Sequence, residues 1–163
     1  MSALPSQSRY IIGTEACERF SFYGMKSILM LYMTGHLLMS DNWATSTLHI
    51  FVGMVYLLPL AGAWLADKVW GRYKTILYIS LLYCVGHGVL ATADLFHTIE
   101  ARRYILMAGL FIIALGAGGI KPCVSAFMGD QIPNKSPQLM TKAFNAFYWA
   151  INLGSFFSFL VIP

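Results

Sequence analysis

A group of ionisable side chains stands in a stretch near the start of the chain that is otherwise apolar. The stretch reads EACERFSFYGMK, and on a helix Glu15, Arg19, Tyr23 and Lys26 share one face, with Glu18 beside it. A charge at the centre of a lipid-facing helix costs roughly 2.5 to 3.5 kcal/mol, so this face must turn toward protein or water. A carboxylate in a low dielectric favours protonation unless a cation lies beside it. The pattern therefore predicts a proton-sensitive cluster that responds when Arg19 moves. The alternative is a purely structural set of ion pairs that fixes helix packing.

The rest of the sequence indicates the elements that must position this group. Hydrophobic residues make up 58% of the 163 residues and charged residues only 11%, against about 25% in a soluble domain. Apolar runs long enough to cross a membrane as helices, which takes about 20 residues, alternate with short polar patches. No stretch alternates cleanly as in a membrane barrel. We predict an all-α membrane protein with about five spans: Tyr10–Leu38, Thr45–Ala66, Tyr73–Ala93, Tyr104–Phe127 and Ala143–Ile162.

The charges between the spans predict the topology. With a cytoplasmic amino terminus, the inner segments carry most of the basic residues and the outer loops carry only Arg102 and Arg103, as the positive-inside rule requires. The inner basic residues are Arg9, Lys68, Arg72, Lys74, Lys135 and Lys142. This scatter of basic residues argues against nucleic-acid binding, and the cysteines show no metal-ligand spacing. Because five spans are an odd set for a transporter built from six-helix halves, we expect residues 1–163 to be an incomplete amino-terminal bundle.

A second intramembrane cation follows in the fourth span. Lys121 stands near the end of that span in GAGGIKPCVSA, where glycines permit close helix approach and Pro122 locally frees backbone groups. A lysine there can reach a central cavity. The alternative is a lysine that extends along the helix to the membrane interface.

Three separated motifs resemble the proton-dependent oligopeptide transporter family of the major facilitator superfamily. They are ERFSFYG with its preceding glutamate, GAWLADKVWGRYKT from Gly62, and FYWAINLGS from Phe147. The resemblance covers nearly the whole chain. It implies the major facilitator superfamily fold, two six-helix halves that rock around a central cavity and import di- and tripeptides with protons. Protons are then the coupling ion and no other cofactor is expected.

The resemblance also implies roles for single residues. Glu15, Glu18 and Arg19 look like the family's proton-coupling triad, and Arg19 and Lys121 like its two cations for the peptide carboxylate. Peptide-contacting positions are matched by Tyr23, Lys26, Tyr56 and Asn152. Lys26 stands where many members have arginine, so it keeps the charge and loses the bidentate fork. Simple aromatic packing is the alternative for Tyr56.

Further positions take their expected roles from the same resemblance. His49 resembles a histidine linked to proton coupling in animal members, and a histidine titrates near neutral pH. A neutral, hydrogen-bonded histidine is the alternative for His49 and the favoured reading for His87, which no motif supports. Asp67 and Arg72 lie in the predicted inner loop, where such charges latch one conformation; a solvated turn is the alternative.

The sequence is also compatible with functions other than peptide transport. We expect a multi-pass protein of the inner or plasma membrane that works as a monomer when complete. A relative that carries another small anionic solute, such as nitrate, would keep the same triad. A passive channel usually presents charged rings from several subunits. An intramembrane enzyme is the least favoured alternative, because no comparable catalytic spacing such as H-E-x-x-H occurs.

Overall fold

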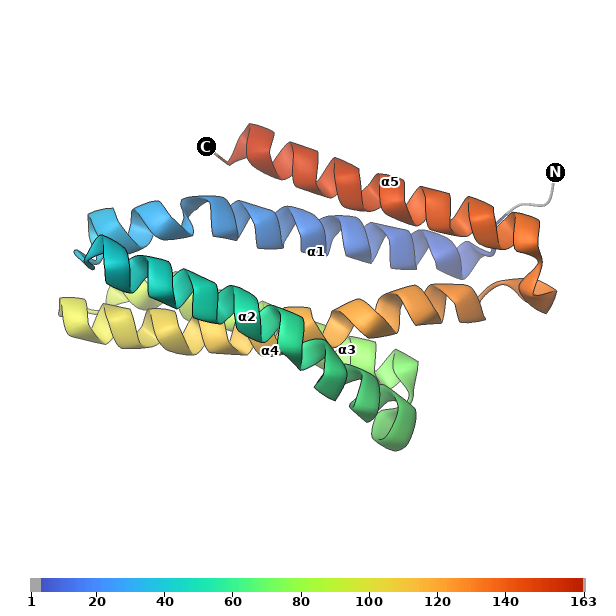
Figure 1. Cartoon of the computed structure of the whole chain (residues 1–163), viewed down its shortest axis with the longest axis horizontal. Helices are drawn as coiled ribbons and strands as arrows, with labels where there is room; N and C mark the ends of the chain where they lie inside the picture. The colour runs from blue at the N-terminus through green and yellow to red at the C-terminus, as the bar shows by residue number, and fades with distance from the viewer. Residues whose placement is uncertain (1–3, 163) are drawn as a thin grey trace. The chain divides into compact units, whose positions relative to one another are not determined.

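The computed structural model describes residues 4–162, except for the side chain of Lys135, and the part it describes is helical with short connections. Short π-helical segments follow the first two long helices, at Tyr32–His36 and Ala66–Trp70, and 3-10 turns precede the last two, at Ala93–Leu95 and Pro133–Lys135. The long helices in Figure 1 are α1 Ser6–Leu31, α2 Asp41–Leu65, α3 Arg72–Ala91, α4 Ile99–Asp130 and α5 Pro137–Val161.

These helices confirm the five elements predicted from the sequence, but α1, α2, α4 and α5 begin four to six residues before the predicted starts, and the difference is largest in α4 and α5. Helix α4 begins at Ile99 rather than Tyr104, and α5 begins at Pro137 rather than Ala143. The prediction followed apolar residues alone, whereas both helices open with a polar first turn or two. Proline is favoured in the first turn of a helix because its missing N–H has no intrahelical partner there, which explains the start of α5.

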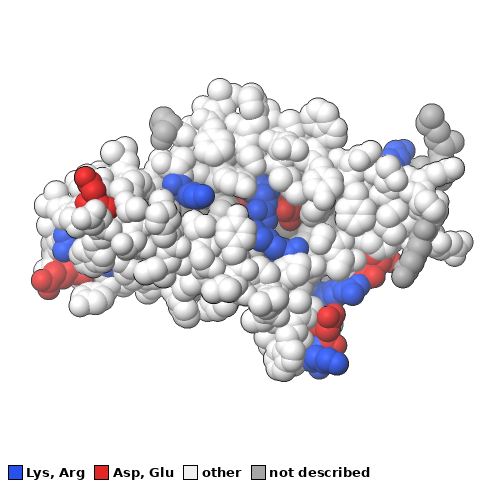
Figure 2. Space-filling model, in the orientation of Figure 1, with Lys and Arg blue, Asp and Glu red and all other residues white. Residues whose placement is uncertain are grey.

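Four of the helical segments in the described residues are long and apolar enough to cross a membrane. They are Asp41–Trp70, Arg72–Leu95, Ile99–Asp130 and Pro137–Val161. Helix α1 is of similar length but carries Glu15, Glu18, Arg19 and Lys26 within its middle turns. On the face drawn in Figure 2, uncharged residues form nearly all of the surface and the charged ones form small groups. By composition alone, α1 is therefore a weaker candidate for a membrane span than these four segments, because it carries more charged residues.

The chain divides into two compact units, and each is described by itself. The first contains the chain up to Ile28 together with residues from Val124 onward, and the second contains Leu29–Cys123. In the first unit α1 and α5 lie side by side (Figure 1). A β-carbon on Gly24 would lie 3.2 Å from Ser158 Oγ and would clash with the Ile162 side chain, so the two helices are in close contact.

The second unit is held together by close approach of α4 to its neighbours. A β-carbon on Gly62 of α2 would lie 2.5 Å from the α-carbon of Gly119, and one on Gly118 would lie 2.7 Å from Leu58 Cβ. Helix α3 meets α4 in the same way at Gly116. The predicted role of these α4 glycines in helix packing is confirmed, since a side chain at any of them would force the helices apart.

The connection between α2 and α3 is shorter than the sequence predicted. Asp67 lies in the π-helical segment that continues α2, and Arg72 is the first residue of α3, so neither lies in an extended inner loop. Gly71 makes the whole turn, with φ of 76° and ψ of 158°, a combination almost restricted to glycine. The expected placement of both charges in a loop is therefore wrong, because helical hydrogen bonding continues to both sides of a single glycine.

Candidate functional site

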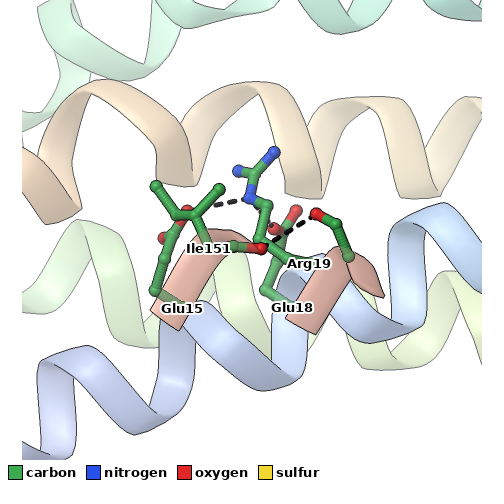
Figure 3. Close-up of polar contacts among 5 residues, drawn as sticks. Glu15, Glu18, Arg19 and Ile151 are labelled. Atoms are coloured by element: carbon green, nitrogen blue, oxygen red, sulfur yellow. Dashed lines mark hydrogen bonds and ion pairs between the residues drawn. The ribbon is translucent and has the colours of Figure 1, made fainter. Parts of the chain in front are cut away.

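The first candidate site is an ion cluster on α1, shown in Figure 3. Arg19 Nε lies 2.8 Å from Glu15 Oε1 and 2.8 Å from Glu18 Oε2. The Arg19 side chain is 9% exposed and each carboxylate side chain is 5% exposed. A buried charge is tolerated only when it is paired, and here one guanidinium nitrogen lies between two carboxylates. The predicted cluster of these three side chains is confirmed as a geometric feature.

The helix itself brings these groups together. Glu15 and Arg19 are four residues apart and therefore neighbours on one face of α1, while Glu18 precedes Arg19 directly. Arg19 uses Nε for the carboxylates, and in Figure 3 the terminal nitrogens of its guanidinium point away from both of them. With all three groups ionised, the cluster carries one more negative than positive charge. A proton bound to either carboxylate makes these three side chains neutral in sum.

Helix α5 covers this cluster through its backbone. A β-carbon on Gly154 would lie 3.1 Å from Arg19 Cβ and would clash with the carbonyl oxygen of Ala16. Ile151, one turn earlier on α5, accepts a hydrogen bond from Ser155 Oγ at 2.9 Å, which is drawn in Figure 3. Sequence reasoning assigned no role to Gly154. Gly154 is the glycine of FYWAINLGS, and a small residue at this place in a helix indicates a close contact with a neighbouring helix.

The remaining candidates on α1 are less buried than the cluster. The Tyr23 ring packs against Phe22 and Phe159, with centroids 5.7 Å and 6.0 Å away, and its side chain is partly exposed. Lys26 is also partly exposed. The residues predicted to share one face of α1 therefore form a stripe that runs from a buried end at Glu15 to a more accessible end at Lys26.

Asn152 lies on an exposed face of α5. Its side-chain amide donates a hydrogen bond to the carbonyl of Tyr148 at 2.8 Å, one turn earlier on the same helix. Together with Asn145, Tyr148 and Trp149, it lines an open hollow of about 380 Å³. The spacing of these four residues matches one helical face, a signal in the sequence that our reasoning used only for Asn152.

The second unit holds another pair of candidates. Lys121 Nζ on α4 lies 5.4 Å from the centre of the Tyr56 ring on α2. Helix α4 runs from Ile99 to Asp130, so Lys121 lies in its last third, three residues further from the helix end than the predicted span implied. The helix continues past Phe127 through Met128 and Gly129 and ends at Asp130. Lys121 is half-buried and Tyr56 is exposed.

The other candidates in the second unit differ in their exposure. His49 is exposed on α2, Asp67 is exposed, and Arg72 is partly buried at the start of α3. The His87 ring stacks edge-on against Tyr83, with centroids 4.6 Å apart. Among the residues that the structure describes, no group of metal-binding side chains is found.

Comparison with known proteins shows what the chain is related to. The model of the family described as "POT family" matches residues 73–163. "Peptide transporter family 1" of Drosophila melanogaster is 46% identical over 161 residues, covering 98% of this chain and 22% of the relative. Human "Solute carrier family 15 member 2" is 41% identical, covering 99% of this chain and 22% of the relative. The chain thus spans about a fifth of the length of these curated relatives.

Solved structures agree with this assignment. The crystal structure of the POT family transporter PepTSo is 48% identical, with a TM-score of 0.85, and the match covers 96% of this chain and 31% of that one. An auto inhibited POT family peptide transporter is 46% identical, with a TM-score of 0.84, 94% of this chain and 30% of that one. Members of the family are transporters rather than enzymes. This chain therefore belongs to the POT family of multi-pass membrane transporters and has the fold of the major facilitator superfamily.

Proposed function

We propose that the complete protein imports di- and tripeptides together with protons. The names of the relatives support a peptide substrate, since the Drosophila relative is called a peptide transporter. A further structural neighbour, 28% identical with a TM-score of 0.85, is a POT family transporter in complex with a thioalcohol conjugated peptide. In this proposal residues 1–163 supply five helices of a six-helix amino-terminal half, and the other half closes the site by alternating access.

The observation that carries the proposal is the position of Arg19 Nε, 2.8 Å from each of two buried carboxylates. Because the cluster holds two acids and one base, it has an excess negative charge in surroundings that solvate charge poorly. A proton from the outer side neutralises Glu15 or Glu18 and weakens that acid's attraction for Arg19. The guanidinium is then available to a different carboxylate, that of the peptide.

Two cations hold the peptide carboxylate in this mechanism. The terminal nitrogens of Arg19 point away from its own acids in Figure 3, which suits a second partner, and Lys121 supplies the other positive charge. Charge-assisted hydrogen bonds of this kind are about twice as strong as neutral ones. Tyr23, Tyr56 and Asn152 hydrogen-bond the peptide backbone, so recognition does not depend on the identity of the peptide side chains.

The remaining residues support the cycle. His49 takes part in proton transfer, Lys26 contributes charge at the accessible end of the α1 stripe, and Asp67 and Arg72 stabilise one conformation at the turn between α2 and α3. The protein lies in the plasma or inner membrane with its amino terminus in the cytoplasm and works as a monomer. The basic residues on the proposed inner side support this orientation.

Transport by the complete protein in liposomes tests the coupling. Glu18→Gln removes a protonatable group while keeping its size, so we expect loss of gradient-driven accumulation of a labelled dipeptide with counterflow exchange retained. Glu100→Gln is the matched control, because Glu100 is an exposed acid in the first turn of α4. Unchanged accumulation by Glu18→Gln would contradict the assignment of Glu18.

Substrate competition distinguishes peptides from other anions. The cations Arg19 and Lys121 would attract any small carboxylate or nitrate, so charge alone does not select a peptide. We expect unlabelled dipeptides to compete with the labelled dipeptide, while nitrate and simple conjugated acids do not. Uptake of an anionic solute without peptide uptake would replace the peptide proposal with the other transporter function.

A further inference from the structure

Lys121 meets the face of the Tyr56 ring rather than its hydroxyl group. The ammonium nitrogen lies 5.4 Å from the ring centre, within the distance of about 6 Å at which a cation is attracted to an aromatic face. Within the part of the chain that the structure describes, Tyr56 Oη makes no hydrogen bond. The contact between these two side chains therefore depends on the ring.

The crossing of α2 and α4 fixes this contact. Gly118 packs against Leu58 and Gly119 packs against Gly62, so the two helices touch through their backbones near both side chains. Cys123 Sγ adds a contact to the Gly62 carbonyl at 3.7 Å. Helical side chains lean toward the amino terminus of their helix, so Lys121 reaches back from the crossing to the level of Tyr56. The lysine is thus directed by packing as well as by attraction to the ring.

We propose that Tyr56 is a positioning residue, whose ring holds the Lys121 ammonium where the carboxylate of the substrate binds; this rests on the proposed function. A lysine side chain has four flexible bonds, and fixing it before binding removes entropy that binding would otherwise cost. A ring face contacts one side of an ammonium group, and the group has three N–H donors in all. In this inference the ring of Tyr56 positions Lys121, and this role is additional to the proposed hydrogen bond from its hydroxyl to the peptide backbone, which both test substrates share.

The test uses two substrates that differ only at the group Lys121 is proposed to bind. The KM of the complete transporter is measured for a dipeptide and for the same dipeptide with a carboxy-terminal amide, and the ratio of the two values is the readout. Tyr56→Phe keeps the ring, and Tyr56→Leu removes it. Tyr104→Leu is the matched control, because Tyr104 is equally exposed in the same unit. Since KM does not depend on the amount of protein, reduced expression of a variant leaves the ratio interpretable.

We expect Tyr56→Leu to reduce the preference for the free carboxylate by roughly 2- to 30-fold, the range that a cation–π contact supports. Tyr56→Phe and Tyr104→Leu should retain the preference, and in a Lys121→Gln background Tyr56→Leu should change it no further. Equal loss in Tyr56→Phe and Tyr56→Leu would overturn the inference by assigning the effect to the hydroxyl. An unchanged KM ratio in Tyr56→Leu would also overturn the inference. So would a Tyr56→Leu effect that is as large in the Lys121→Gln background as in the wild type. Failure of the wild type to take up the dipeptide would instead refute the proposed function itself.

Discussion

Gly154 of α5 packs directly against Arg19 of α1. A β-carbon at Gly154 would lie 3.1 Å from Arg19 Cβ, closer than nearly all real contacts of this kind, and would clash with the Ala16 carbonyl oxygen. Any side chain at position 154 would therefore push the α5 backbone away from α1. Burial of the Arg19 cluster within this unit depends on the absence of a side chain at Gly154.

Gly154→Ala should destabilise the complete protein by about 1–3 kcal/mol, the usual cost of forcing an extra methyl group into a packed interface. Gly13→Ala on α1 is the matched control, because a β-carbon at Gly13 meets nothing within 4 Å. Since alanine is favoured over glycine in helices by up to about 1 kcal/mol, Gly13→Ala should be neutral or stabilising. Thermal unfolding of the purified protein in detergent measures both. Equal effects of the two substitutions would show that α5 does not pack as closely on α1 as described.

Removal of Arg19 should be more costly than removal of the whole ion cluster. Arg19→Met leaves two carboxylates buried without their cation, and breaking a buried ion pair in this way typically costs about 3–5 kcal/mol. Adding Glu15→Gln and Glu18→Gln removes those charges, so the triple variant should recover part of the lost stability. The measurement is again the unfolding temperature of the complete protein.

Arg9→Met supplies the control for that comparison. Arg9 is exposed near the start of the same helix, and substitutions at such surface positions usually change stability by less than about 0.5 kcal/mol. A triple variant less stable than Arg19→Met would mean that the carboxylates are stabilised by groups other than Arg19. In that case the charge balance of the cluster would not explain a response to protons.

The sequence predicted the helices well because membrane helices are specified by long apolar runs. It predicted their polar ends poorly, as at Ile99 and Pro137, since the first turns contribute little apolar surface. It also predicted a loop at Asp67, where a single residue, Gly71, reverses the chain. That turn depends on a backbone conformation, and the charges beside it carried no information about the length of the connection.

The candidate site could be predicted where it depends on one helix. The spacing of Glu15, Glu18 and Arg19 is enough to place them together, and the cost of burying charge is enough to predict their pairing. The contact between Lys121 and Tyr56 could not be predicted, because it requires knowing how α2 crosses α4. The close approach at Gly154 is hidden for the same reason, since a small residue in a motif does not identify the helix that it meets.

Arg102 and Arg103 are the two basic residues predicted for the outer loops; the structure places both at the start of α4 and gives each a local partner. Arg103 donates three hydrogen bonds to the Leu37 and Leu38 carbonyls, at 2.7 to 2.9 Å, and lies 5.1 Å from the centre of the Trp43 ring. Leu38 has φ of 50°, a left-handed conformation that few residues other than glycine adopt. Arg103 therefore stabilises the turn between α1 and α2.

The two neighbouring arginines should differ sharply in their contribution to stability. Arg103→Gln loses charge-assisted hydrogen bonds to two carbonyls of a strained turn and should cost about 1.5–3 kcal/mol. Arg102 pairs with Asp94 at 3.8 Å and donates hydrogen bonds to the Phe96 and Asp94 carbonyls at 2.7 and 3.5 Å. Because these contacts lie in an exposed connection where water can replace them, Arg102→Gln should cost less than about 1 kcal/mol. Unfolding temperatures give the ranking, and hydrogen exchange at Leu37 to Met39 shows whether the turn opens first. A larger loss in Arg102→Gln would refute this account, because the expected difference rests on the partly buried, strained turn that Arg103 binds, whereas the carbonyls bound by Arg102 are exposed.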